Sequence, residues 1–336
     1  MRFDDTTSRL RAAAPAPQLP TRARILSGRA FVLLVVAMAS CWPPVPGLAA
    51  EPVSKRLLVI GIDGCRPDAI HAAVEATTLH TLIREGAFSN QADVLGDRNT
   101  GADTSTGPGW SSALTGVWAD KHQVRNNLFL KNNLKEHPTL FHRVQSAHPE
   151  ADVSLFVSWP QFHRFLFAGL KGCKLVLDGD ENGYAAADHQ VTAAAEKQLA
   201  QGDPRALFVY YGEVDITGHG YGFHPKSPKY TKAIEAVDVQ IARVLKAMRA
   251  RPAFAREDWL TIVCTDHGGR NREHGLGDKV PEIRTGFIIL HGPSVTPGAI
   301  KEKTNNVDVT ATALKHLGIT IDPEWKLDGR PIGLKQ

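Results

Sequence analysis

Aspartate and histidine residues recur beside glycines at a few points of this sequence. Asp63 precedes Gly64, and the second half of the chain contains an Asp-x-x-x-His motif, an Asp-His-Gly motif and a later His-Gly pair. Each motif alone is more simply a turn or a helix cap. Zinc, however, binds imidazole nitrogen and carboxylate oxygen in sets of four. Together the motifs approach the number of ligands that two adjacent zinc ions need, and their members are Asp63, Asp215, His219, Asp266, His267 and His274.

A loop rich in hydroxyl side chains lies between Asp63 and these later motifs. It contains Thr104, Ser105 and Thr106, and it leads through glycine and proline into an expected helix near Trp110. A hydroxyl is a weak nucleophile until a metal or a base activates it. The loop therefore offers a candidate nucleophile, and its residues alone leave all three hydroxyls open.

The elements that would position these side chains alternate along the chain. Short apolar runs predict strands at 57–62, 153–157, 206–211, 260–264 and 285–290, and longer patterns predict helices at 68–84, 185–199, 230–250 and 307–317. Strands that alternate with helices predict an α/β fold with a mostly parallel central sheet and helices on both faces. Ligands of such sheets bind beyond the carboxyl ends of the strands, which is where the motifs fall.

The first fifty residues resemble an export signal. Arg22, Arg24 and Arg29 precede the apolar run 30–38, and the small residues Gly47, Ala49 and Ala50 follow. This order is typical of a secretory signal, and the run is too short to span a bilayer comfortably. We expect a signal peptide at 1–50, a single catalytic domain at 51–336 and an exported, periplasmic or secreted protein without a transmembrane span. Cys41 follows a lipoprotein-like segment, so a lipid anchor there is the alternative.

The overall composition is that of an ordinary globular protein. The 336 residues are 43 % hydrophobic and 22 % charged, with a net charge of +4. The basic excess is too small and too scattered for binding to a nucleic-acid duplex. Without Cys41, three cysteines remain, so one disulfide at most can form among Cys65, Cys173 and Cys264. None has the spacing of a thiolate zinc site.

The motifs together resemble the nucleotide pyrophosphatase/phosphodiesterase branch of the alkaline phosphatase superfamily. They run in that family's order over most of the chain from Arg56 onward, and the combination is specific. The matching segments are Asp63-Gly64-Cys65-Arg66, Thr115-Gly116 with His122, Asp215 with His219, Asp266-His267-Gly268 and His274-Gly275.

This resemblance implies an alkaline-phosphatase-like fold and a phosphodiesterase or pyrophosphatase that acts on a small phosphoester, such as a nucleotide. Counting back from Thr115-Gly116 places the family's nucleophile at Thr106, which would form a phosphothreonine intermediate. The resemblance also implies two zinc ions. One would be bound by Asp63, Thr106, Asp266 and His267, and the other by Asp215, His219 and His274.

The chain departs from the family pattern at the phosphoryl-binding position. Gly109 stands where we expect the family's asparagine, so Asn126, Asn127 or backbone donors at the helix start would replace it. Trp159 would stack on a base or pack under a loop. The departure leaves a phosphomonoesterase of the same superfamily open, and a non-catalytic, metal-stabilised surface binding protein is the rival of another class. Cys65 faintly resembles a sulfatase nucleophile but lacks its surrounding motif.

Overall fold

The computed structural model describes residues 53–172 and 174–335. These residues fall within one compact unit, Ala50–Gln336. The expected signal peptide, the lipoprotein alternative at Cys41 and the third cysteine, Cys173, lie outside the described residues. Within them, no helix has the length and apolar character that crossing a bilayer requires. Cys65 and Cys264 are buried free thiols.

The described chain forms a sheet of eight strands in the order β4-β3-β5-β1-β6-β7-β2-β8. The five strands β4, β3, β5, β1 and β6 run parallel to one another, whereas β7 pairs antiparallel with both β6 and β2. The prediction of a mostly parallel sheet is therefore confirmed. The strands are β1 (Ser54–Ile62), β2 (Ala87–Asp93), β3 (Asp152–Val157), β4 (Lys174–Val176), β5 (Pro204–Tyr211), β6 (Glu257–Cys264), β7 (Thr285–His291) and β8 (Gly298–Ala299).

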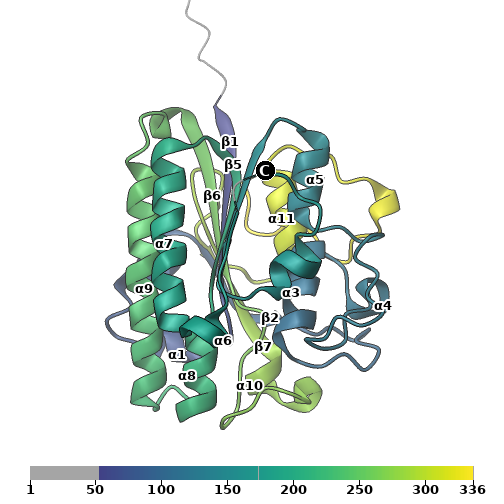
Figure 1. The fold of residues 1–336 in the computed structure, drawn as a ribbon, viewed down its shortest axis with the longest axis vertical. Helices are drawn as coiled ribbons and strands as arrows, with labels where there is room; N and C mark the ends of the chain where they lie inside the picture. Colours follow the sequence, from purple (N-terminus) through teal and green to yellow (C-terminus); the bar gives the residue numbers. More distant parts are fainter. Residues whose placement is uncertain (1–52, 173, 336) are drawn as a thin grey trace, which may run out of the picture. The chain divides into compact units, whose positions relative to one another are not determined.

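Helices cover both faces of this sheet (Figure 1). Successive β1 residues alternate between two cores: Leu57 and Val59 join one, Leu58 and Ile60 the other. The helices are α1 (Pro67–Ala72), α2 (Thr77–Glu85), α3 (Thr106–Thr115), α4 (Ala119–His122), α5 (Leu140–Ala147), α6 (Gly179–Asn182), α7 (Tyr184–Gln201), α8 (Glu213–Tyr221), α9 (Pro228–Arg249), α10 (Pro281–Arg284) and α11 (Asp308–His316), with short turns of other helix types at 162–166, 254–256, 277–279 and 323–325.

The sequence prediction missed three strands and merged two helices. Strand β2 has polar residues at four of its seven positions, and β4 and β8 are only three and two residues long. Such segments form strands because a neighbour supplies the hydrogen bonds, so their own pattern is weak. The helix predicted at 68–84 is two helices, α1 and α2, because the chain turns between them at 73–76.

Candidate metal and phosphoester site

Three adjacent strands in the middle of the sheet carry the candidate ligands at their carboxyl ends. Strands β5, β1 and β6 are neighbours, and they lead to Asp215, Asp63 and Asp266 respectively. Because they run parallel, their carboxyl ends lie at the same edge of the sheet. The fold thus brings together residues that are about 50 to 200 positions apart in the sequence.

Asp63, Asp266 and His267 form the first group of side chains. The Nε2 atom of His267 lies 3.4 Å from Oδ1 of Asp63 and 3.3 Å from Oδ2 of Asp266. All three residues are buried. These three converging atoms have no hydrogen-bond partner among the described residues. Buried polar atoms without partners are costly, and a shared cation would satisfy all three, so the residues present fit a metal ion.

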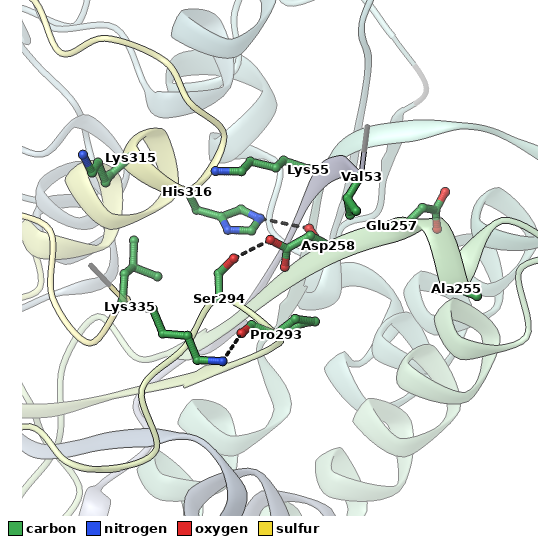
Figure 2. A pocket seen from close by; sticks show the side chains of 11 residues that line it. Val53, Lys55, Ala255, Glu257, Asp258, Pro293, Ser294, Lys315, His316 and Lys335 are labelled. Carbon is green, nitrogen blue, oxygen red and sulfur yellow. Dashed lines mark hydrogen bonds between the residues drawn. The ribbon is translucent and has the colours of Figure 1, made fainter. Parts of the chain in front are cut away.

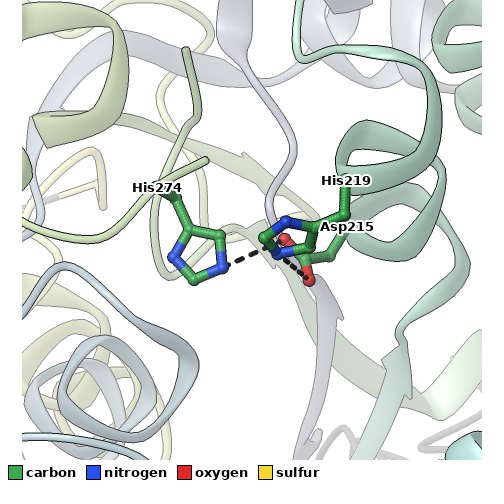
Figure 3. A group of neighbouring side chains, drawn as sticks. All are labelled: Asp215, His219 and His274. Atoms are coloured by element: carbon green, nitrogen blue, oxygen red, sulfur yellow. Dashed lines mark ion pairs between the residues drawn. The ribbon is translucent and has the colours of Figure 1, made fainter. Parts of the chain in front are cut away.

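Asp215, His219 and His274 form the second group (Figure 3). Asp215 and His219 lie one turn apart on α8, and His274 approaches from the loop after β6. Its Nε2 atom lies 3.7 Å from Asp215 Oδ1, while His219 Nε2 lies 3.5 Å from Asp215 Oδ2. Asp215 Oδ1 is another buried atom without a hydrogen bond in the described chain. These are the two groups of three potential ligands found among residues 53–172 and 174–335.

The two groups adjoin each other. The rings of His267 and His274, one from each group, stack with centroids 3.9 Å apart. Gly64 also joins them, because it follows Asp63 and packs directly against Asp215. Its φ is +61°, and a Cβ atom there would lie 2.5 Å from Asp215 Oδ1. The close approach therefore requires glycine at this position.

Burial dominates the electrostatics of the cluster. Burial raises the pKa of Asp63, Asp215 and Asp266, and the negative charge of Asp63 raises the pKa of the other two further. Burial also lowers the pKa of His267 to about 4 and that of His274 to about 3. Neutral imidazole is the form that binds metal, and a bound cation would favour the ionised carboxylates.

Hydrogen bonds orient each histidine with Nε2 toward the cluster. The Nδ1 atoms of His219, His267 and His274 lie 2.8 to 2.9 Å from backbone carbonyl oxygens. A carbonyl only accepts, so each Nδ1 carries the proton and each Nε2 keeps a free lone pair. Histidine ligands of metals are typically held in this way.

Two aromatic residues that sequence reasoning missed hold the first carboxylate. The Tyr210 hydroxyl donates to Oδ2 of Asp63 over 2.6 Å, and the Trp110 indole N–H donates to the same atom over 3.2 Å. Their bonds leave Oδ1 free to face His267. Tyr210 lies in an apolar run whose pattern indicates core packing, and Trp110 follows the Gly-Pro-Gly segment at the start of an expected helix. Nothing in the sequence marks the second role of either residue.

The three hydroxyls of the loop before α3 have different environments. The Thr104 hydroxyl donates to the His274 carbonyl oxygen and accepts from the Gly277 N–H. Ser105 is buried, and its hydroxyl has no partner in the described chain. Of the three, Thr106 is the one that lines the pocket formed by the second group. Thr106 is also the first residue of α3.

This pocket has a volume of about 170 Å³ and contains two of the predicted contact residues, but neither Gly109 nor Asn126. Trp159 and Asn127 both line it. Gly109 instead packs against the backbone of Asp266, where a Cβ would lie 2.5 Å from the carbonyl oxygen. The lining residues are Thr106, Asn127, Trp159, Asp180, Tyr184, Tyr210, Gly212, Asp215, Ile216, His219 and His274.

Fewer backbone N–H groups at the start of α3 are free to bind a phosphoryl oxygen than the sequence analysis expects. The Gly107 N–H donates to Asn127 Oδ1 over 2.7 Å, Pro108 has no N–H, and the Gly109 N–H donates to the Ser105 carbonyl oxygen. Asn127 is thereby fixed beside Thr106. Its Oδ1 atom is engaged, which leaves its amide N–H groups available to the pocket.

A larger cavity of about 660 Å³ lies at the other end of the strands (Figure 2). It is lined by residues at the beginnings of β1 and β6, such as Lys55 and Asp258. It contains neither ligand group and no hydroxyl loop. Size alone therefore does not identify the site of chemistry in this protein.

The fold is alkaline-phosphatase-like, and solved structures with low sequence identity share it. A 2-O GAG sulfatase aligns with a TM-score of 0.65 at 15 % identity, covering 84 % of this chain and 73 % of that one. Murine ectonucleotide pyrophosphatase/phosphodiesterase 5 aligns with a TM-score of 0.62 at 16 % identity, covering 80 % and 96 %.

Sequence comparison identifies the family. The model of the type I phosphodiesterase/nucleotide pyrophosphatase family matches residues 57–149 and 172–283, so the chain belongs to this family. Human ectonucleotide pyrophosphatase/phosphodiesterase family member 7 is 23 % identical in an alignment over 279 residues that covers 74 % of this chain and 56 % of that protein. A phosphopentomutase of Edwardsiella ictaluri (strain 93-146) is 23 % identical over 38 % of this chain and 28 % of its own length. The chain thus spans about half or less of these relatives.

Proposed function

We propose that this protein is a zinc-dependent phosphodiesterase or nucleotide pyrophosphatase that uses Thr106 as its nucleophile. The observation that supports this most strongly is the convergence of buried, partnerless ligand atoms on two adjoining points, the second of which shares a pocket with Thr106. A purely structural core would satisfy such atoms internally. Membership of the type I phosphodiesterase/nucleotide pyrophosphatase family supports phosphoester hydrolysis as the class of reaction.

The donor atoms suit two zinc ions. Asp63, Asp266 and His267, with Thr106, would bind one, and Asp215, His219 and His274 the other. Both sets consist of the nitrogen and oxygen ligands that zinc prefers. When bound, the metal pair would lower the pKa of a coordinated hydroxyl and neutralise charge on the attacking and leaving oxygens.

Thr106 would carry the covalent step. Its Oγ1 atom forms a bond to phosphorus as the hydroxyl loses its proton. The bond from phosphorus to the leaving oxygen breaks, and the leaving alkoxide takes up a proton and departs as the alcohol. Water then attacks the phosphothreonine, and its P–O bond to Thr106 breaks with return of the proton. Thr106 is the first residue of α3, whose positive end favours the phosphoryl oxygens, and the Asn127 amide would donate to one of them.

The pocket favours a diester over a monoester. A bound monoester carries one more negative charge than a diester, and enzymes hold that charge with cationic side chains. None of the residues lining this pocket is a lysine or arginine, and the described lining includes the carboxylate of Asp180. Trp159 and Tyr184 offer aromatic surface for the remainder of the substrate.

Two further points belong to the same proposal. Murine ectonucleotide pyrophosphatase/phosphodiesterase 5 with one threonine replaced by alanine is described as inactive and in complex with AMP, which supports a threonine nucleophile and a nucleotide-like substrate.

We also propose export through residues 1–50, with residues 51–336 as a single catalytic domain. Cys41 would be the point of lipid attachment if the signal is of the lipoprotein type.

The proposal can be tested with the chain from Glu51 and its Thr106→Ala variant. After loading with zinc, we expect about two metal ions per chain in both proteins. The parent should hydrolyse a nitrophenyl nucleotide diester at least about tenfold faster than nitrophenyl phosphate, a difference of about 1.4 kcal/mol. Thr106→Ala should lose at least about a thousandfold in kcat, whereas Ser105→Ala should retain most activity.

Three outcomes would change the assignment. Faster monoester hydrolysis would replace the diesterase by a phosphomonoesterase. Full activity in Thr106→Ala would refute the nucleophile. Metal binding without activity on either ester would favour the metal-stabilised binding protein.

A further inference from the structure

Helix α3, which begins at the proposed nucleophile Thr106, has a weak sequence for the start of a helix. Its first four residues are Thr106-Gly107-Pro108-Gly109. Glycine is among the poorest helix formers, and proline supplies no N–H for a hydrogen bond. All ten residues of this helix are nevertheless buried. Contacts with other parts of the chain must therefore determine where its first turn lies.

Two side chains at the start of α11 donate hydrogen bonds to the backbone of α3. Both helices lie on the same face of the sheet (Figure 1) and contribute to the same core. Asn306 Nδ2 donates to the Gly109 carbonyl oxygen over 3.0 Å, and the Thr310 hydroxyl donates to the Ala113 carbonyl oxygen over 2.8 Å. The two acceptors are four positions apart, so they lie on one side of α3. The pair of bonds therefore fixes the rotation of α3 about its own axis.

Gly109 is the point at which these contacts reach the candidate metal site. Its N–H donates to the Ser105 carbonyl oxygen over 3.0 Å, which closes the first turn around Thr106. A Cβ atom on Gly109 would lie 2.5 Å from the Asp266 carbonyl oxygen and 2.8 Å from Asp266 Cβ. The bond from Asn306 therefore holds a residue that contacts both the turn of the nucleophile and a candidate ligand.

Asn306 is itself firmly held, yet its side chain is only half satisfied. The residue is 1 % exposed, and its backbone N–H donates to the Asp93 carbonyl oxygen over 2.9 Å. Because a carbonyl oxygen only accepts, Nδ2 is the atom that faces Gly109. Oδ1 is then buried without a hydrogen-bond partner in the described chain. Such an atom costs stability, so the stability of the core alone does not explain an amide at this position.

We propose that Asn306 and Thr310 are positioning residues, which hold α3 at the rotation at which Thr106 faces the pocket and Gly109 lies against Asp266. This inference rests on the proposed function of Thr106. Neither Asn306 nor Thr310 lines the pocket, so both act through α3. A small displacement of a nucleophile slows the chemical step strongly and changes substrate binding less. Loss of either bond should therefore lower kcat more than it raises KM.

Thr310 offers the cleaner test, because valine has nearly the same shape as threonine. Thr310→Val removes the bond to Ala113 and keeps the methyl group that packs against Gly116. Thr310→Ser keeps the hydroxyl and is the conservative variant. The control is Thr312→Val on the same helix. Thr312 is also buried, and its hydroxyl oxygen accepts from the Ile332 N–H over 3.1 Å instead of contacting α3.

Kinetics of the zinc-loaded chain from Glu51 on a nitrophenyl nucleotide diester measure the effect. In Thr310→Val we expect kcat to fall about tenfold and KM to change less than about twofold. Thr310→Ser and Thr312→Val should stay within about twofold of the parent in kcat. Asn306→Ala, which removes the other bond, should lose about tenfold or more in kcat. The parent's kcat in Thr310→Val, or an equal loss in Thr312→Val, would overturn the inference.

Hydrogen exchange separates positioning from general destabilisation and from the proposed function. Both valine variants lose one buried hydrogen bond on α11, so their thermal unfolding should change alike. In the metal-free chain, the amides of residues 109–116 should exchange about tenfold faster in Thr310→Val and at the parent's rate in Thr312→Val. Equal exchange in the two variants would refute the role of Thr310 in holding α3. If the parent hydrolyses no nitrophenyl ester, the proposed function fails, and the exchange rates still decide whether Thr310 holds this helix.

Discussion

At the residue scale, the site depends on one close approach between two ligand segments. Gly64 separates Asp63 of the first group from Asp215 of the second, and it has no room for a side chain. Its positive φ alone would permit a substitution at moderate strain. The contact with the Asp215 carboxylate is a second constraint, because any side chain at position 64 would displace this candidate ligand.

Gly64→Ala should therefore damage the second metal site more than the stability of the fold. The new methyl group must displace Asp215, so we expect metal affinity at this site to fall about 10- to 100-fold, with a parallel loss of activity. Isothermal titration with zinc measures it. Gly101→Ala is the matched control, because Gly101 has a φ of +75° and open space around it. Equal affinities in the two variants would contradict the proposed role of the contact.

At the scale of elements, a buried aspartate on one helix positions the helix that carries two candidate ligands. Asp188 of α7 accepts hydrogen bonds from the backbone N–H groups of Gly212 and Glu213, at the start of α8, and from the Ser158 hydroxyl. Burial raises its pKa to about 7. Tyr184 of the same helix packs over Gly212. Together these contacts fix where α8 begins and hence where Asp215 and His219 point.

Asp188→Ala should loosen the start of α8. We expect a loss of about 1 to 2 kcal/mol in unfolding free energy, as for other caps, and weaker zinc binding at the second group. Asp238→Ala is the matched control, because Asp238 of α9 accepts from the N–H groups of Thr78 and Leu79 at the start of α2. That variant should lose stability while keeping its zinc affinity. Zinc affinity that is unchanged in Asp188→Ala would refute this coupling.

A second positioning element is the arginine of the Asp-Gly-x-Arg motif. One terminal nitrogen of Arg66 donates to the carbonyl oxygens of Phe223 and Gly269, over 2.9 and 3.0 Å. This joins the segment after α8 to the loop between His267 and His274. Four consecutive residues therefore supply three functions. Asp63 is a candidate ligand, Gly64 permits the close approach to Asp215, and Arg66 holds two backbone segments together.

At the scale of the whole molecule, stability at low pH depends on buried neutral histidines as well as on the candidate ligands. His122 is fully buried, and its Nδ1 accepts a hydrogen bond from the Val124 N–H over 3.0 Å. Its Nε2 lies 3.0 Å from the Ser112 hydroxyl. Burial lowers its pKa from 6.5 to about 3. Protonation would break the bond from Val124 and place a charge in the core.

The unfolded chain protonates His122 below pH 6.5, whereas the folded chain does so only near pH 3. The unfolded state therefore binds the extra proton, and stability falls as the pH falls through this window. Between pH 7 and about pH 5, we expect His122 to account for roughly 2 kcal/mol of this loss. Urea unfolding of the parent and of His122→Gln at the two pH values measures it. A variant with the same pH dependence as the parent would exclude His122 as a source.

Much of the architecture follows from local pattern. The five apolar runs became β1, β3, β5, β6 and β7, and the long amphipathic segments became α7, α9 and α11, because buried parallel strands and amphipathic helices have strong periodic signals. The six aspartates and histidines lay beside strand ends, so their meeting at one edge followed from the parallel order. The direction of β7 and the existence of β2, β4 and β8 did not follow, since strand pairing is a property of neighbours.

Other features were decided only by the packed chain. Which hydroxyl of three faces the pocket depends on the contacts of Thr104 with the segment from His274 to Gly277, far away in sequence. The support of Asp63 by Tyr210 and Trp110, and of α8 by Asp188, likewise comes from distant side chains. Residue type and spacing specify which groups can bind a metal. Only tertiary contacts determine which atoms are already satisfied, and the atoms left without a partner are those available for chemistry.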